Sequence, residues 1–109
     1  MDYELKTNGE FTLQETEEAC ENQQLGGWKL DSITTDSIFL GGNVKLMNKA
    51  AFNRVNSTDV LTNLEFRELG TDDSEQVIQQ MKGQGWIFIC DSHLYVKDNH
   101  TRVLVFGKN

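Results

Sequence analysis

The chain opens with segments whose hydrophobic patterns predict different elements. Tyr3 to Lys6 is a short strand candidate, and Trp28 to Ser32 alternates apolar and polar positions, as a strand with one solvated face does. Between them, apolar or small side chains recur at three- and four-residue spacing, which is the period of a helix. This stripe consists of Leu13, Thr16, Ala19, Cys20 and Gln23. The first 32 residues therefore predict a strand, a helix and a second strand.

Both ends of this helix carry local signals. Thr12 and Glu15 match a capping box, in which the hydroxyl satisfies an early helical amide and the carboxylate reaches back. Gly26-Gly27 supplies the left-handed backbone that ends such a helix. We therefore expect the helix to start at the capping box and to end at the glycines.

A hairpin is expected after the second strand. Ile38-Phe39-Leu40 precedes the turn cluster Gly41-Gly42-Asn43, and Val44 to Met47 returns as the partner strand. The polar segment from Lys49 to Asp59 follows, and its length of about ten residues is ordinary for a connection. It is predicted to join two halves of the chain that share one core.

The second half predicts the same series of elements. Val60 to Leu69 is the entering strand, and Asp72 with Glu75, or Ser74, can cap a helix that ends at Gly83-Gln84-Gly85. The apolar face of this helix carries Val77, Ile78 and Met81. A strand, a second helix and a strand led by tryptophan are therefore expected again.

The strand after the second helix reads as the most buried one. Trp86 to Cys90 is a nearly continuous apolar run, which predicts a central strand covered on both faces. Asp98-Asn99-His100 then makes a turn, and Arg102 to Phe106 is the closing strand.

An internal repeat appears when the chain is shifted against itself by 58 residues. Gly27-Trp28 then falls on Gly85-Trp86, and Leu46 falls on Leu104. The copies are expected at approximately 1–50 and 58–109. We predict an α+β fold of two strand-helix-strand-strand repeats, with about six mostly antiparallel strands and both helices packed on one face. A pseudo-two-fold arrangement of the copies is the natural expectation.

The glycine and tryptophan strings carry a resemblance. Leu25-Gly26-Gly27-Trp28-Lys29-Leu30 and Lys82-Gly83-Gln84-Gly85-Trp86-Ile87 resemble the signature of short bacterial and phage domains of unknown function. In that family, a helix ends in a Gly-x-Gly-Trp or similar turn, and a final strand closes near a basic residue, here Lys49 and Lys108. The resemblance implies a small strand-helix-strand-strand fold, usually present once, and a bacterial or phage source, but no activity.

Composition narrows the classes of function. With 109 residues and 38% hydrophobic content, residues 1–109 suit a single domain. The net charge of -7 repels phosphate backbones, so duplex nucleic acid is disfavoured as a partner and basic partners are favoured. The chain has no apolar run of about 18 residues and no secretory signal pattern, so we expect a cytoplasmic protein that does not bind membranes.

Asp91-Ser92-His93 contains the residue types of a hydrolase triad. Neighbours on a strand alternate faces, however, which puts Ser92 and His93 on opposite sides. Asp91 and His93 share a face, where His100 could join them across the hairpin as a metal cluster, although exposed polar residues are the commoner explanation. We therefore predict no catalytic residues and no metal, and the protein is expected not to be an enzyme.

The cysteines and glycines add no cofactor chemistry. Cys20 and Cys90 form no CxxC pair and are expected to be buried free thiols, although a disulfide between them stays open. Each glycine pair follows a helix, whereas phosphate-binding loops precede one. No cofactor is predicted.

A non-enzymatic protein-interaction module is the favoured function. Sheet edges and an acidic helix surface are available, whereas catalytic groups are scarce. A sharper form is a small acidic inhibitor from a phage or mobile element, whose carboxylates stand where its target expects nucleic-acid phosphates. Trp28 and Trp86 occupy equivalent positions, which favours packing over ligand contact. The predicted protein-binding residues, for which a solvated face is the alternative, are Glu15, Glu17, Glu18 and Glu21.

The alternative function is a small-ligand binding or sequestering protein for a nucleotide or metabolite. Its pocket would lie at the joint between the repeats or between the subunits of an oligomer such as a homodimer, because 109 residues enclose little cavity. An anionic ligand would need clustered basic donors. The available donors are Lys45, Lys49, Arg54, Arg67 and Arg102.

Overall fold

The computed structural model describes residues 2–8, 12–53, 61–96 and 99–108, and the same series of elements occurs in both halves. The first half contains a strand, a helix and a hairpin: β1 (Asp2–Asn8), α1 (Leu13–Leu25), β2 (Lys29–Leu40) and β3 (Asn43–Asn53). The second half contains β4 (Asn63–Glu68), α2 (Ser74–Gly83), β5 (Ile87–Val96) and β6 (Asn99–Lys108).

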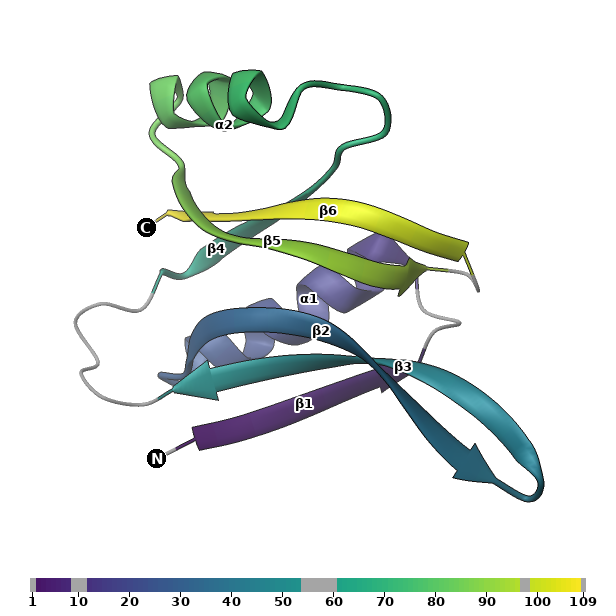
Figure 1. The fold of residues 1–109 in the computed structure, drawn as a ribbon. Helices are drawn as coiled ribbons and strands as arrows, with labels where there is room; N and C mark the ends of the chain where they lie inside the picture. Colours follow the sequence, from purple (N-terminus) through teal and green to yellow (C-terminus); the bar gives the residue numbers. More distant parts are fainter. Residues whose placement is uncertain (1, 9–11, 54–60, 97–98, 109) are drawn as a thin grey trace.

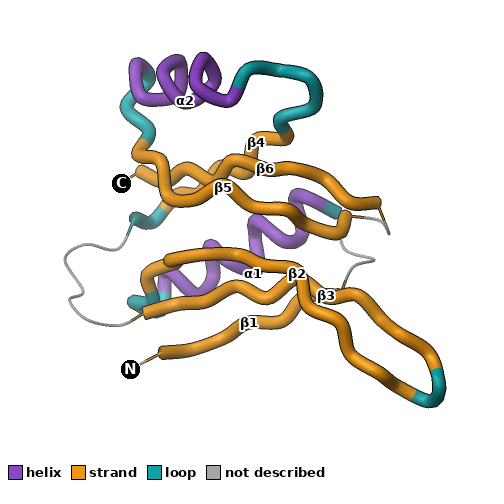
Figure 2. The backbone as a smooth tube through the Cα atoms, viewed as in Figure 1, coloured by secondary structure: helices purple, strands orange, loops and turns teal. Residues whose placement is uncertain are grey.

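Each half forms its own three-stranded sheet (Figures 1 and 2). The first sheet has the strand order β1-β3-β2 and the second β4-β6-β5, so the last strand of each half lies in the middle. Every strand pair in these two sheets is antiparallel. The prediction of an α+β fold with two helices and six antiparallel strands is confirmed for the described residues.

The predicted ends of α1 are also confirmed. The amide of Glu15 donates to the Thr12 hydroxyl and the Glu15 carboxylate accepts from the Thr12 amide, each at 3.1 Å, which completes the capping box. At the other end, Gly27 has a φ of 91°, and the amide of Trp28 turns back to the carbonyl of Gln23 at 3.1 Å. Local signals therefore determine where this helix begins and ends.

The start of α2 differs slightly from the prediction. Its N-cap is Asp73, one residue from either predicted cap, and the Asp73 carboxylate accepts from the amide of Glu75 at 2.9 Å. Gly83 is the last helical residue, and Gly85 adopts the positive φ of 91° that follows the helix.

The prediction that Trp86 to Cys90 forms the central strand is wrong. β5 lies at the edge of the second sheet, whereas β6 pairs with β4 and with β5. The four residues from Val103 to Phe106 have 0% of their surface exposed. Both strands are apolar runs, and only the pairing decides which of them is central.

The prediction that both helices pack on one face is wrong. Cys20 of α1 belongs to a core cluster with Val105 of β6, whereas Met81 of α2 belongs to a second cluster with Leu104 and Phe106. Successive residues of a strand point to opposite faces, so α1 and α2 cover opposite faces of the second sheet. α1 lies between the sheets on the side of β4, β2 lies alongside β5, and α2 lies on the outer face of the second sheet (Figure 1). Because β6 is apolar on both faces, burial of both requires a layer on each side.

The two halves stack in the same sense and not about a pseudo-two-fold axis. The first sheet turns its helix-bearing face, with Phe52, to the shared core, whereas the second sheet turns the face opposite α2, with Val105. A two-fold axis would bring the same face of both sheets together. The far face of the first sheet carries the exposed Ser32 and Thr34, so this end of the stack faces solvent.

The shift of 58 residues holds for only part of each half. Both β2 and β5 have a bulge at corresponding places, between Leu30 and Ser32 and between Phe88 and Cys90. After the hairpin turns, Phe52 on β3 pairs with Leu30, and Phe106 on β6 pairs with Phe88. Phe52 and Phe106 are therefore equivalent, and they are 54 residues apart in the sequence. The alignment of Leu46 with Leu104 is therefore not a structural equivalence, because the first hairpin is longer.

Both helices in the described part of the chain are too short and too polar to cross a membrane.

Candidate functional site

The two sheets meet where β2 lies alongside β5. Here side chains of the first half bond to the backbone of β5. The Thr35 hydroxyl donates to the carbonyl of His93 at 2.8 Å. The buried Asn48 amide donates to the carbonyl of Tyr95 and accepts from its N–H, each at 2.8 Å, so it pairs with β5 as a backbone strand would.

The opposite edge of the second sheet is held by α1. The Glu17 carboxylate accepts from the amide of Phe66 on β4 at 2.9 Å. The buried Gln24 side chain donates to the carbonyl of Leu61 and accepts from the amide of Leu30 at 3.0 Å. Because both edges of the second sheet bond to the first half at these residues, they are not free there for another strand.

The four predicted protein-binding carboxylates have different surroundings. Glu15 belongs to the capping box, and the half-buried Glu17 is bonded to β4. Glu18 is exposed and accepts a hydrogen bond from Gln14 at 3.3 Å, and Glu21 is half-buried. The capping-box spacing is a sequence signal for the role of Glu15, whereas nothing in the sequence indicates the contact of Glu17.

Burial raises the pKa of Glu17 above its ordinary value. The neighbouring charges of Glu21 and Glu65 raise this pKa further, whereas the hydrogen bond from the amide of Phe66 opposes the shift. The side chain therefore carries its negative charge at a cost to the fold, which is not typical of a freely solvated acidic face.

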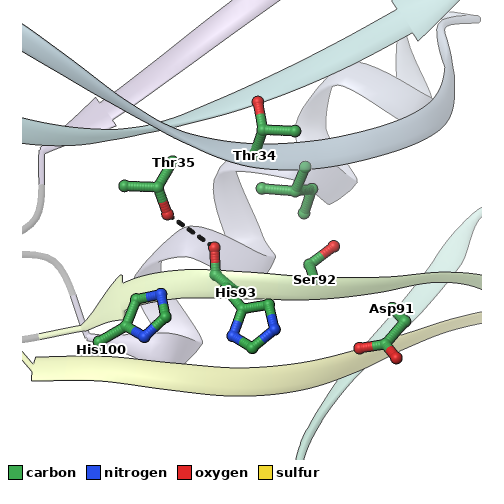
Figure 3. A pocket seen from close by; sticks show the side chains of 7 residues that line it. Thr34, Thr35, Asp91, Ser92, His93 and His100 are labelled. Atoms are coloured by element: carbon green, nitrogen blue, oxygen red, sulfur yellow. Dashed lines mark hydrogen bonds between the residues drawn. The ribbon is translucent and has the colours of Figure 1, made fainter.

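An open groove of about 420 Å³ lies at the joint between the sheets (Figure 3). It is lined by Ile33, Thr34, Thr35, Asp91, Ser92, His93 and His100. The groove thus gathers the polar residues of β5 that the sequence singled out, together with residues of β2 that it did not.

The rings of His93 and His100 are stacked in this groove, 4.9 Å apart and within 7° of parallel. The lone pairs of parallel rings point along separate planes, so the pair does not converge on one metal ion. Asp91 bonds instead to Arg102, whose Nε lies 3.1 Å from a carboxylate oxygen, and this hydrogen bond lowers the pKa of Asp91. Within the described ranges, no three His, Cys, Asp or Glu side chains are placed to hold a metal.

The possible nucleophiles lie on the inner side of β5. Ser92 is buried with its Oγ 3.3 Å from the Cys90 Sγ, while His93 is exposed on the other face, as strand alternation predicted. Cys20 and Cys90 are both free thiols, the first buried and the second half-buried. Burial raises the pKa of Cys20 to about 12 and also raises that of Cys90, so both are neutral thiols near pH 7.

The other predicted residues do not form a binding site. Trp28 and Trp86 are half-buried and pack against the first and the second core cluster, respectively. Arg102 lies beside the groove, whereas Arg67 lines a separate groove of about 280 Å³ next to α2, and Lys49 is half-buried. Arg54 and the side chain of Lys45 lie outside the described residues.

The clearest surface feature is the outer part of the first hairpin, residues 36–47, which we call the arm. It extends away from both sheets (Figure 1). Phe39, Val44 and Leu46 are 72%, 64% and 38% exposed. They lie on the face that continues through Asn48 and Ala50 to the buried core, because alternate residues share a face. This surface was not predicted from the sequence, although its apolar residues flank the turn glycines.

The chain matches no family model, no curated protein and no solved structure. Any function proposed for it therefore depends on the geometry described above.

Proposed function

We propose that this chain is a non-enzymatic protein-interaction module and that the arm is its principal contact surface. The observation that carries the proposal is the strip of Phe39, Val44 and Leu46, three exposed apolar side chains on one face of a projecting hairpin. Large apolar side chains concentrated in this way are typical of protein-binding surfaces. A cytoplasmic location and an absence of duplex nucleic-acid binding are part of this proposal.

The acidic inhibitor is a narrower form of the same proposal. Glu18 is the exposed member of the four carboxylates that has no role in capping or in the contact with β4. A partner with a basic groove would bind α1 mainly through Glu18 and Glu21, and its binding would weaken with salt because exposed charges are screened.

We also propose that the two halves are diverged copies of one strand-helix-strand-strand unit, of the kind found in the bacterial and phage domains that the chain resembles. The equal strand orders, the φ of 91° at both Gly27 and Gly85 and the matching bulges support this origin.

A small-ligand binder is the second candidate, and the groove at the joint between the sheets favours it. Its stacked His93 and His100 offer ring edges to a ligand. Among the described side chains, the basic group beside the groove is Arg102, and it forms a salt bridge with Asp91. A neutral metabolite therefore fits the groove better than a nucleotide.

The test is a pull-down of tagged protein from bacterial lysate to which untagged chain has been added. Washes at low and high salt are read by mass spectrometry, with Phe39→Ser and Glu18→Gln as variants and Leu25→Ser as the matched control. Leu25 is 69% exposed and lies outside the arm. The proposal predicts a protein that wild type and Leu25→Ser retain in both washes and that Phe39→Ser loses.

Other results would redirect the proposal. A protein lost at high salt and lost by Glu18→Gln would identify the acidic surface as the contact. If nothing is enriched, protein binding is wrong, and metabolites released from the purified chain by heating become the measurement of interest.

A further inference from the structure

The arm is a ribbon of two strands beyond the support of the sheets. β1 pairs with β3 only as far as Met47, and the joint with β5 reaches Thr35 on β2. From Ser37 paired with Leu46 to Leu40 paired with Asn43, four residue pairs are therefore held by the hairpin alone. An isolated two-stranded ribbon is marginally stable in water. A surface that covers these pairs would therefore stabilise them.

The uncovered face of the arm is continuous with a buried one. Phe39 is paired with Val44, and Leu46 lies two residues along the same face. The next residues on that face, Asn48 and Ala50, are buried beneath the second half of the chain. The apolar surface of the first sheet thus extends past the point where α1 and the second sheet stop covering it.

Charge indicates what could cover this face. Residues 36–47 contain one acid, Asp36, and one base, Lys45, and are formally neutral, although the whole chain carries -7. Two copies of an acidic chain repel each other over most of their surfaces. They can meet through the arms, because the arms carry no net charge and project from the acidic remainder of each chain. Exposed charges farther apart than about 10 Å are screened at ordinary salt.

We propose that a second copy of this chain covers the arm, so that two arms pack face to face about a two-fold axis. This inference rests on the proposed function and names the partner. In such a self-complementary contact, Phe39 of each copy lies against the strip of Val44 and Leu46 of the other. Three apolar side chains per copy are a small interface, so the expected dissociation constant is about 10–100 μM.

Sedimentation velocity on the full chain tests the proposal from about 5 to about 500 μM. We expect the weight-average sedimentation coefficient of wild type to rise toward that of a dimer. Phe39→Ser and Val44→Ser should remain monomeric over the same range. Leu25→Ser, which removes an equally exposed apolar side chain elsewhere, should associate as wild type does.

Salt and folding controls keep the result interpretable. An apolar contact between acidic chains should strengthen slightly when salt rises from about 50 to about 500 mM, because the repulsion is screened. Circular dichroism must show that both serine variants are folded; if one is not, the other decides. Monomeric wild type at every concentration, or serine variants that associate as wild type does, would overturn the second copy as partner.

The two proposals can fail separately. A wild-type chain that stays monomeric but retains a different protein in the pull-down, with Phe39→Ser losing that protein, keeps the arm as a contact surface and rejects self-association. A chain that neither dimerises nor retains any protein rejects both.

Discussion

At the scale of single residues, Glu17 combines two opposing effects. Its carboxylate closes a hydrogen bond to the edge of β4, but it does so half-buried and near Glu21 and Glu65. The raised pKa of Glu17 means that burial and like charge outweigh the hydrogen bond in their effect on the charged form. The contact between position 17 and the amide of Phe66 is therefore more favourable when the side chain at position 17 is neutral.

We expect Glu17→Gln to raise the melting temperature at pH 7 by about 1–4 °C. The amide keeps an acceptor for the amide of Phe66 and carries no charge. Since the pKa is raised in the folded state, the folded chain binds more protons than the unfolded chain, and the Glu17 contribution falls as pH rises through that pKa. The gain should therefore vanish below the ordinary value of 4.5.

Thermal unfolding followed by circular dichroism at about pH 4 and about pH 7 measures this difference. Glu18→Gln removes the same charge from an exposed position and should change the melting temperature little. A lower melting temperature of Glu17→Gln at pH 7 would mean that the charged hydrogen bond outweighs the burial.

At the scale of elements, the two helices end in the same way. The amide of Trp28 bonds to the carbonyl of Gln23 at 3.1 Å, and that of Trp86 bonds to the carbonyl of Met81 at 3.0 Å. A glycine with a φ of 91° precedes each tryptophan. Each turn places the tryptophan against the core cluster under its own helix, so this local geometry also directs the strand that follows.

Gly27→Val and Gly85→Val should each destabilise the fold by about 1–2 kcal/mol or more, because a branched side chain is strained at positive φ. Chemical denaturation measures the free energy of unfolding. Gly83→Ala is the control, since Gly83 is helical with open space around it and the change should stabilise by about 0.5–1 kcal/mol. A harmless Gly85→Val beside a costly Gly27→Val would show that the two turns are not equivalent.

At the scale of the whole molecule, the first half supports the second at both of its sheet edges. Asn48 and Thr35 bond to β5, while Glu17 and Gln24 bond to β4 and the residues before it. The shared core cluster lies between these two rows of contacts. We therefore expect the two halves to unfold together.

Asn48→Leu tests this dependence. The leucine keeps a similar volume but leaves the N–H and carbonyl of Tyr95 without the Asn48 partner, at about 1–3 kcal/mol for each group. Denaturation should show one transition at lower denaturant, and hydrogen exchange should accelerate at the amide of Tyr95. Thr35→Val, which removes one bond at a less buried site, should cost less. An unchanged transition for Asn48→Leu would show that the joint contributes little to stability.

The sequence alone determined the features that depend on residues a few positions apart. The capping box of Thr12 and Glu15, the glycine turns before each tryptophan and the hairpin at Gly41-Gly42 all involve contacts within one turn, so their residue types are sufficient signals. The order of helices and strands follows from them.

Only the tertiary structure decided which faces meet. Contacts of Glu17 with Phe66, Thr35 with His93 and Asn48 with Tyr95 join residues that are 49, 58 and 47 positions apart. An apolar run such as Trp86 to Cys90 indicates that a strand is covered. It does not indicate which element covers the strand or where the strand lies in the sheet. The layer order, the central position of β6 and the uncovered face of the arm arise from how the two halves stack, because burial is a property of the assembled chain.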